Sequence, residues 1–427
     1  MRLPTIALIL LSLTIRVSAQ NIDNIINATT VEQTERTLSS DDMRGRAVFT
    51  PDIEKAADYI ESRFKAAGLK TWNGSNSYRQ PFSMIQAKLI SATATFDGQL
   101  LPAGRVFAIS SASDLAIDEN SGYEKVQIKA GQNFQTEVLH YMHAKKNILV
   151  LLDESFSTNF PRLARLGHQQ FKSPTSVVFV LAAAEPSHYS IKIQQEIKES
   201  ALANVVGILP GKRKEEIVIF SGHYDHLGVT KTPKGGDSIY NGANDDASGT
   251  TAVIELADYF SKQSNRERTL VFAAFTAEEV GEYGSQYFSG QFDPGQVVAM
   301  FNIEMIGSES KWGGNSAFIT GYERTDMGKI LQKNLAGSSF TFYPDPYPEQ
   351  QLFYRSDNAS LARQGVPAHT ISTTQIDKDK YYHQLTDELS TIDIANMVRI
   401  IKAIALSSTS IVDGKDTPTR VDTTQVR

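Results

Sequence analysis

The stretch that decides the fold reads Ile217-Val218-Ile219-Phe220-Ser221-Gly222-His223-Tyr224-Asp225-His226. It is an apolar, strand-like run followed at once by groups that can ligate a metal or move a proton. Two later runs have the same form: residues 269–275 lead to Glu278-Glu279, and residues 297–303 lead to Glu304. A loop with adjacent aspartates, Asp245-Asp246, lies between the first two runs. The pattern predicts an α/β fold with a site at the carboxyl edge of its sheet.

The composition limits the classes of partner and of metal site. At 427 residues the chain is long enough for two domains or one elaborated domain. Its formal net charge of -6 gives no reason to expect nucleic acid or an anionic membrane as partner. It has no cysteine, so any metal must be held by histidine and carboxylates. The oligomeric state has no signature in the sequence.

Residues 1–19 have the pattern of a signal peptide. Arg2 gives a short basic start, residues 6–15 are apolar, and Val17-Ser18-Ala19 resembles a small-residue cleavage site. The apolar run is too short to span a bilayer, and the alternative is a buried amino-terminal helix. We therefore expect cleavage near Ala19 and a secreted or periplasmic protein with no membrane span.

The remaining chain divides by composition into three parts. Residues 20–81 and 204–406 carry strand and helix patterns, with amphipathic helices expected at 53–69, 251–260 and 392–406. Residues 82–203 are β-rich, with buried strands at 147–152 and 176–181, and predict an inserted domain. Residues 407–427 are rich in Ser, Thr, Asp and Pro and predict a disordered tail.

The carboxylates expected at the sheet edge need cations. Two bare carboxylates about 4 Å apart repel by roughly 1 kcal/mol in water and about 4 kcal/mol at a surface-like dielectric. With histidines in the same set, divalent zinc is the natural partner. Zinc lowers the pKa of a bound water to about 7, which would give a hydrolase its nucleophile. One further carboxylate must stay free of metal to carry the proton, and the adjacent pair Glu278-Glu279 suits this division.

Three segments carry a family resemblance, in the order in which the family has them. Residues 221–228, 242–249 and 275–281 resemble the zinc exopeptidases of the aminopeptidase, transferrin-receptor and glutamate-carboxypeptidase superfamily. The resemblance implies a mixed, mostly parallel sheet flanked by helices. It covers roughly 200 residues. Lys146 to Asp153 resembles more weakly the protease-associated insert domain that many members carry.

The resemblance implies a site with two Zn²⁺. His223 would bind one zinc together with Glu304, and Asp245 would bridge both ions. Glu279 and His383 would complete the second site, and peptides would be the substrate. Glu278 would act as general base and then as acid, and Asp225 would hydrogen-bond to His223 and orient it. In the family pattern, Asp246 would follow Asp245 across a strained peptide bond. The alternative role for Asp246, which is compatible with the first, is that of a helix N-cap residue.

Two positions depart from the family pattern. Many members have Asn-Leu-Asp-Met-Ile-Gly where this chain has Asn302-Ile303-Glu304-Met305-Ile306-Gly307. Glutamate ligates zinc as aspartate does, but its extra methylene changes the geometry of the metal shared with His223. The common Ser-Asp-His run is Ser356-Asp357-Asn358 here, so no role of that histidine transfers. His226 is expected to support the site rather than to ligate.

The sequence therefore predicts a secreted zinc metallopeptidase, an aminopeptidase that hydrolyses the amino-terminal peptide bond. The alternatives are a carboxypeptidase or dipeptidase of the same superfamily, a glutaminyl cyclase, or a non-catalytic binding protein on this fold. Retention of every ligand position and of the base favours an enzyme. Specificity loops such as residues 341–352 have no readable code, so the preferred terminal residue is open.

Overall fold

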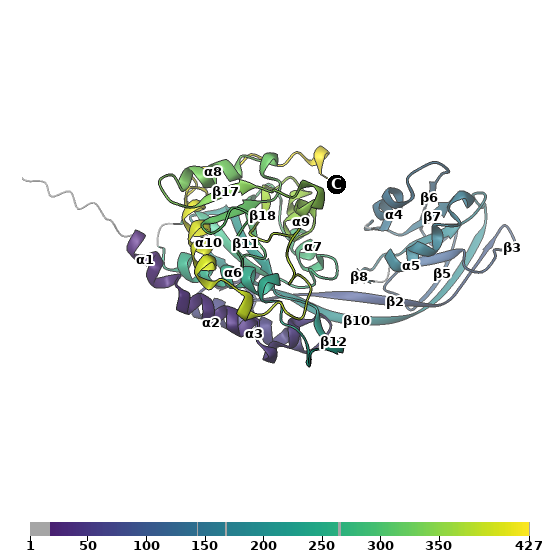
Figure 1. Ribbon diagram of the computed structural model, residues 1–427. Helices are drawn as coiled ribbons and strands as arrows, with labels where there is room; N and C mark the ends of the chain where they lie inside the picture. Colours follow the sequence, from purple (N-terminus) through teal and green to yellow (C-terminus); the bar gives the residue numbers. More distant parts are fainter. Residues whose placement is uncertain (1–17, 143, 167–168, 264–265, 427) are drawn as a thin grey trace, which may run out of the picture. The chain divides into compact units, whose positions relative to one another are not determined.

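The computed structural model describes residues 18–426 except 143, 167–168 and 264–265 (Figure 1). The chain divides into two compact units, Met1–Gln80 with Ala203–Arg427, and Pro81–Leu202. The predicted signal peptide falls on residues outside the described ones, apart from its last two, with which helix α1 (Ser18–Ile25) begins.

The first unit is built on a mixed, mostly parallel sheet. Its strands run in the order β17, β16, β18, β15, β11, β14, β10. Strand β11 pairs in parallel with β14 and β15, and β15 pairs in parallel with β18, whereas β16 runs antiparallel to β18 and β10 runs antiparallel to β14. The bounds are β10 (Tyr189–Leu209), β11 (Arg213–His223), β14 (Arg268–Phe275), β15 (Val297–Ile303), β16 (Ser316–Ile319), β17 (Thr341–Pro344) and β18 (Ala368–Ser372). The predicted fold class is confirmed.

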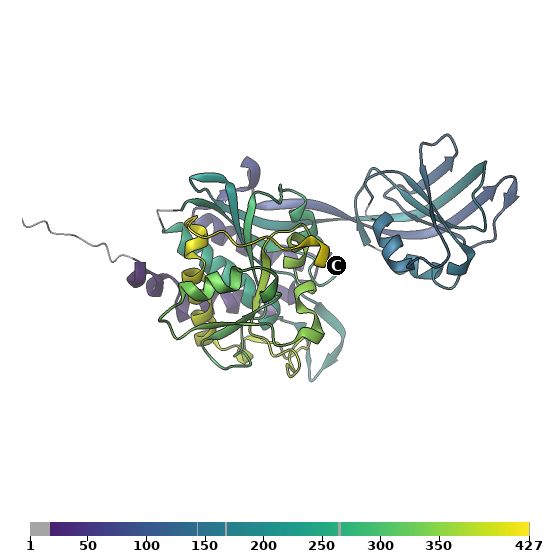
Figure 2. The same cartoon turned by 90° about the horizontal axis from the view of Figure 1, so that it is seen from above.

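Successive residues of a strand point to opposite faces of the sheet, and both faces of this sheet carry apolar residues. Helices therefore cover both faces. Val218 and Phe220 of β11 join one apolar cluster, and Ile217 and Ile219 join the other. Apolar residues of seven α-helices among the described residues pack in the first cluster: α1, α2 (Ala28–Leu38), α3 (Asp52–Ala66), α6 (Ser248–Ser261), α8 (Met327–Asn334), α10 (Ile394–Ser407) and α11 (Thr409–Val412). The second cluster takes residues of α7 (Tyr283–Ser289) and α9 (Asn358–Ala362). Figures 1 and 2 show α6 and α10 side by side over the sheet.

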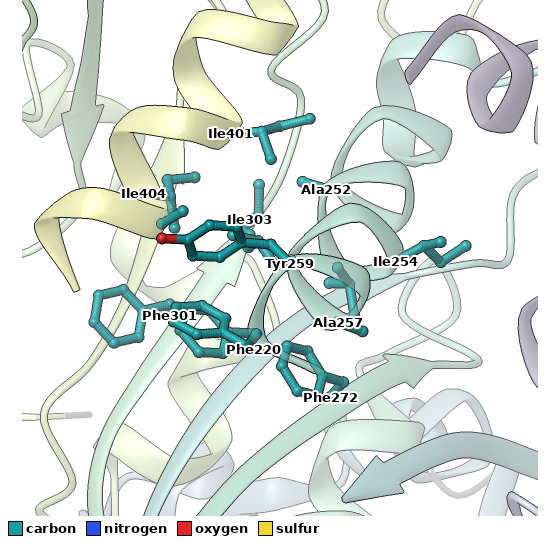
Figure 3. Close-up of a cluster of buried hydrophobic side chains, with 14 of the residues drawn as sticks. Phe220, Ala252, Ile254, Ala257, Tyr259, Phe272, Phe301, Ile303, Ile401 and Ile404 are labelled. Carbon is teal, nitrogen blue, oxygen red and sulfur yellow. The ribbon is translucent and has the colours of Figure 1, made fainter. Parts of the chain in front are cut away.

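An aromatic stack fixes the three central strands against α6. The ring of Phe220 lies 4.9 Å from that of Phe301 and 5.5 Å from that of Phe272, centroid to centroid (Figure 3). It also stacks on the ring of Phe260 of α6, with centroids 5.3 Å apart. All four rings are buried. Ring pairs of this kind contribute about 0.5–1.5 kcal/mol each beyond their buried area. The carboxyl ends of β11, β14 and β15 are thereby held in register.

The stretch Ile394–Val412, which is α10 with the short α11 (Thr409–Val412), is the one described segment long and apolar enough to cross a membrane by length and composition. In its most apolar window 56% of the residues are buried inside the protein. Met397, Ile400 and Ile404 pack in the first apolar cluster, as expected of a core helix.

The second unit is β-rich. A sheet of its own runs in the order β4, β9, β7, β6, and β7 (Ile148–Leu152) and β9 (Val177–Leu181) are the two strands predicted as buried. Its other elements are β2 (Arg79–Phe96), β3 (Gln99–Leu100), β4 (Val106–Ile109), β5 (Asp114–Asp118), β6 (Glu124–Ile128), α4 (Phe134–Met142), α5 (Leu163–Leu166) and β8 (Gln169–Phe171). The likeness of this unit to a protease-associated domain stays a prediction.

The expectation of a disordered tail is wrong for the described residues 407–426. Ile411, Val412 and Val421 are buried in this segment. The buried guanidinium of Arg268 donates hydrogen bonds to the carbonyl oxygens of Ile411 (2.7 Å) and Asp416 (2.6 Å). The composition of the tail concealed this packing, because a few apolar residues and a partner on a distant strand are enough to order a polar segment.

Candidate metal centre

Three neighbouring strands deliver the predicted residues to one edge of the sheet. His223 is the last residue of β11 and pairs in register with Phe275 of β14, while Glu304 follows directly on β15. The aspartate pair lies in the short helical turn η5 (Ala243–Ala247), which precedes α6. The peptide bond between Asp245 and Asp246 is cis.

Two groups of ligand atoms share the carboxylate of Asp245. The first group is His223, Asp245 and Glu304, and the second is His226, Asp245 and Glu279, with the ligand atoms of each group within 4.8 Å of one another. Oδ1 of Asp245 lies 3.2 Å from Nε2 of His223, and Oδ2 lies 3.2 Å from Nε2 of His383. His383 therefore reaches the same carboxylate as His223, although 160 positions separate the two histidines in the sequence.

The geometry of these atoms fits cations placed between them. Nε2 of His223, Nε2 of His383 and Oε2 of Glu304 are buried and have no hydrogen-bond partner among the described residues. His383 Nε2 lies 3.1 Å from Oε2 of Glu279 as well as close to Asp245, yet the alignment is not that of a hydrogen bond. Buried polar atoms are normally satisfied, so orphan atoms that converge indicate a missing common partner. Imidazoles and carboxylates are the ligand set of zinc in a chain that lacks cysteine.

Without a metal, the histidines and carboxylates of the centre shift one another's pKa values. Burial would raise the pKa of Asp245, but the imidazoles of His223 and His383 outweigh it and hold that pKa well below its ordinary value. In return, the carboxylates of Asp245 and Glu279 raise the pKa of His383 to about 10. A proton and a metal ion thus compete for the same nitrogen.

Glu278 stays outside both ligand groups but close to them. Its Oε2 lies 4.0 Å from Nε2 of His223. Burial raises the pKa of Glu278 well above its ordinary value, and the nearby carboxylates of Glu304 and Asp357 act in the same direction. A carboxyl group whose pKa is raised, beside the ligands yet free of them, is suited to accept and return a proton.

Asp225 holds the loop of the two glutamates. Its Oδ1 accepts a hydrogen bond from the backbone N–H of Glu278 (3.1 Å), and its Oδ2 accepts one from that of Glu279 (3.3 Å). Oδ1 also lies 3.7 Å from Nδ1 of His223, whose hydrogen-bond partner is the backbone carbonyl of Asp225 at 3.2 Å. The residue therefore positions His223 and both glutamates together.

Asp246 holds three elements at the sheet edge. Its carboxylate accepts backbone hydrogen bonds from His223 (3.1 Å), Gly249 (3.0 Å) and Met305 (3.1 Å). An added Cβ at Gly249 would meet both carboxylate oxygens at 2.5 Å, so only glycine leaves room for this arrangement. The bond to Gly249 reaches the first turn of α6, but the N-cap residue of α6 is Ala247, so Asp246 is not the capping residue.

Three further residues shape the centre, and of these the sequence had singled out only His226. His226 was expected only to support it, yet its Nδ1 lies 2.7 Å from Oε1 of Glu279 and its own Nε2 is buried without a partner among the described residues. Asp387, in the segment of the late histidine, accepts hydrogen bonds from the backbone N–H groups of Asn244 (2.8 Å) and Asp245 (3.1 Å). The third is Arg46, described next.

Arg46 is a fully buried cation behind the centre. Its guanidinium donates to four backbone carbonyls, those of Leu38 (2.7 Å), Tyr224 (2.9 Å), Asn241 (2.6 Å) and Gly242 (2.9 Å). These acceptors come from the end of α2, the segment after β11 and the approach to η5. The only sequence signal was the turn Arg44-Gly45-Arg46, which does not say which arginine points inward.

Replacing Arg46 by methionine is expected to lower the free energy of unfolding by about 3 kcal/mol or more, because buried carbonyls lose their donor. Urea denaturation measures the loss. Arg44→Met in the same turn is the control: Arg44 is half-exposed and pairs with Asp52 at 3.2 Å, so it should cost about 1 kcal/mol or less. Equal losses in the two variants would contradict the structural role of Arg46.

Taken together, the α/β fold and the paired ligand groups at its sheet edge define the class of the protein as a metal-dependent hydrolase. Residues 204–407 match the model of peptidase family M28. A "probable zinc metalloprotease" of Leptosphaeria maculans is 35% identical over 112 residues, which are 26% of this chain and only 25% of that protein. A "probable leucine aminopeptidase" of Trichophyton verrucosum is 25% identical over 291 residues, 64% of this chain and 74% of that one.

The fold has a solved counterpart. An aminopeptidase from Aneurinibacillus sp. strain AM-1 superposes with a TM-score of 0.54 at 19% identity, covering 96% of this chain and 98% of the other. Residues 204–407, the segment that matches the model of peptidase family M28, contain every member of both ligand groups. These matches support the prediction of a zinc metallopeptidase.

Proposed function

We propose that this chain is an exported aminopeptidase that removes the first residue of peptides with the help of two zinc ions. The observation that carries the proposal is the carboxylate of Asp245, which has an imidazole nitrogen 3.2 Å from each of its two oxygens. One carboxylate placed between two imidazoles is the geometry that bridging of two cations requires.

Each ion would have its own ligands besides the shared one. His223 and Glu304 would hold the first, and Glu279 and His383 would hold the second. The extra methylene of Glu304 is accommodated, since its carboxylate falls within the first ligand group. His226 would fix Glu279 through the 2.7 Å contact to Oε1.

The chain's own residues would then divide the work of hydrolysis. Zinc, when bound, polarises the scissile carbonyl and lowers the pKa of a water to about 7. The carboxylate of Glu278 would take the proton of the attacking water and return it to the leaving amine. The carboxylate of Asp225 would keep Glu278 in place through its backbone N–H.

The test is a panel of peptides offered to the purified protein. We expect cleavage of carboxyl-blocked aminoacyl amides, loss of activity with a zinc chelator, and recovery when zinc is restored. If the protein cleaves amino-blocked dipeptides but not carboxyl-blocked substrates, it is instead a carboxypeptidase. Cyclisation of an amino-terminal glutamine would indicate a glutaminyl cyclase. Activity that survives exhaustive chelation would contradict a metal-dependent mechanism.

Export belongs to the proposal as well. Its support is the basic start, the apolar run and the small-residue site of residues 1–19. Amino-terminal sequencing of the protein from its native host is expected to find the chain beginning at Gln20. A start at Met1 in the cytoplasmic fraction would contradict it.

A further inference from the structure

A cavity of about 40 Å³ adjoins the first ligand group. Glu304, a member of the first group, lines it. Tyr382 also lines it, and the ring of Tyr382 stacks on that of His383 with centroids 3.9 Å apart. A substrate group that enters this cavity therefore lies beside the reacting bond. The volume has room for about three water molecules, which matches a short polar group.

The wall of the cavity combines apolar and hydroxyl groups with a single cation. Met305, Phe318 and Leu352 are among its apolar residues, and several Ser and Thr side chains supply hydroxyls. Among the described residues, Arg355 is the one basic residue that lines it. Within the same part of the chain, Glu304 is the one carboxylate in the wall, and the metal would neutralise it, so the charge of Arg355 would have no counterpart there.

Arg355 has no carboxylate partner within the described part of the chain. Its only side-chain hydrogen bond there is a long one, 3.4 Å from Nη1 to Oε1 of Gln350. The backbone is fixed nonetheless, since the Arg355 N–H donates to the Leu352 carbonyl at 3.1 Å. Two nearby arginines, by contrast, are held by side-chain partners. Arg324 lies 4.8 Å over the ring of Phe353 and donates to the hydroxyl of Tyr354, and Arg363 pairs with Glu282 at 3.6 Å.

We propose that Arg355 binds a carboxylate of the peptide substrate next to the scissile bond. The proposal rests on the peptidase function above and names its substrate class. The planar guanidinium can take a carboxylate through two parallel hydrogen bonds, which a lysine cannot do. Two carboxylates can occupy that place: the side chain of an acidic first residue, or the free carboxyl group of a dipeptide.

The experiment compares matched substrates that differ only in that charge. The first pair is an aspartyl and an asparaginyl fluorogenic amide, and the second is alanyl-alanine and its carboxyl amide. For wild-type enzyme we expect a higher kcat/KM for the charged member of one pair, and which pair responds identifies the carboxylate. In Arg355→Met this preference should fall by about tenfold or more, and Arg355→Lys should keep part of it.

Lys378→Met is the matched control, because it removes one positive charge from a neighbouring cavity that Arg355 does not line. It should leave both ratios as in the wild type. The inference is overturned if the wild type shows no preference for charge in either pair, or if Arg355→Met leaves both ratios unchanged. If neither pair is cleaved at all, the proposed function fails instead. Calorimetric binding of L-aspartate against L-asparagine, and of alanyl-alanine against its carboxyl amide, to wild type and Arg355→Met, then decides the role of Arg355 separately.

Discussion

Replacing Glu278 by glutamine is expected to lower kcat by about 10²–10⁴-fold, the range over which a positioned general acid–base group contributes. Glutamine has nearly the same shape but cannot accept and return a proton. Because Glu278 lies outside both ligand groups, the zinc content should stay at the wild-type level and KM should change little. Stopped or continuous peptidase assays, with metal analysis of the same samples, measure both quantities.

Glu282→Gln is the control for this substitution. Glu282 lies in the same segment, is largely buried, and pairs with Arg363 rather than with the ligand groups. It should keep most of the activity. A Glu278→Gln enzyme that turns over at the wild-type rate would show that another group carries the proton.

Replacing Asp245 by asparagine is expected to have the largest effect, because this side chain is common to both ligand groups. The amide keeps the shape but loses the charge, and its NH₂ group cannot coordinate. Loss of metal removes several kcal/mol of transition-state stabilisation, and at about 1.4 kcal/mol for each factor of ten this means about 10³-fold or more in kcat/KM.

Metal analysis after dialysis against zinc-free buffer distinguishes this outcome from a simple loss of activity. Both sites should lose zinc together in Asp245→Asn, whereas His383→Ala should chiefly affect the second. Asp237→Asn, on the hairpin that precedes η5, is the control and should retain its metal. Full zinc occupancy in Asp245→Asn would contradict the bridging role.

The sequence predicted the sheet edge well, because the signal for it is local. An apolar run marks each of the strands that lead to His223, Glu279 and Glu304, and parallel pairing brings the ends of these strands together. The helices at 53–69, 251–260 and 392–406 were found within a few residues for the same reason, since the period of the apolar residues records the face that packs on the sheet.

Arg46 and Asp387 could not be predicted as supporting residues, because their partners are distant in the chain and carry no pattern. Arg46 binds carbonyl groups up to 196 positions away, and a backbone carbonyl leaves no trace in the sequence. Asp387 likewise binds backbone N–H groups, 142 and 143 positions earlier. His226 differs from a loop histidine only by where its ring points, which the structure decides.

The contacts of Arg268 have a consequence for synthesis on the ribosome. The guanidinium sits at the start of a central strand, but the carbonyl groups that accept its hydrogen bonds belong to Ile411 and Asp416, 143 and 148 positions later in the chain. A nascent chain halted anywhere before residue 411 must leave this cation hydrated, and the strand end around it open. The sheet can close at that end only after residues 411–416 have been synthesised and have left the ribosome, so products truncated before residue 411 should be preferred targets for cellular proteases.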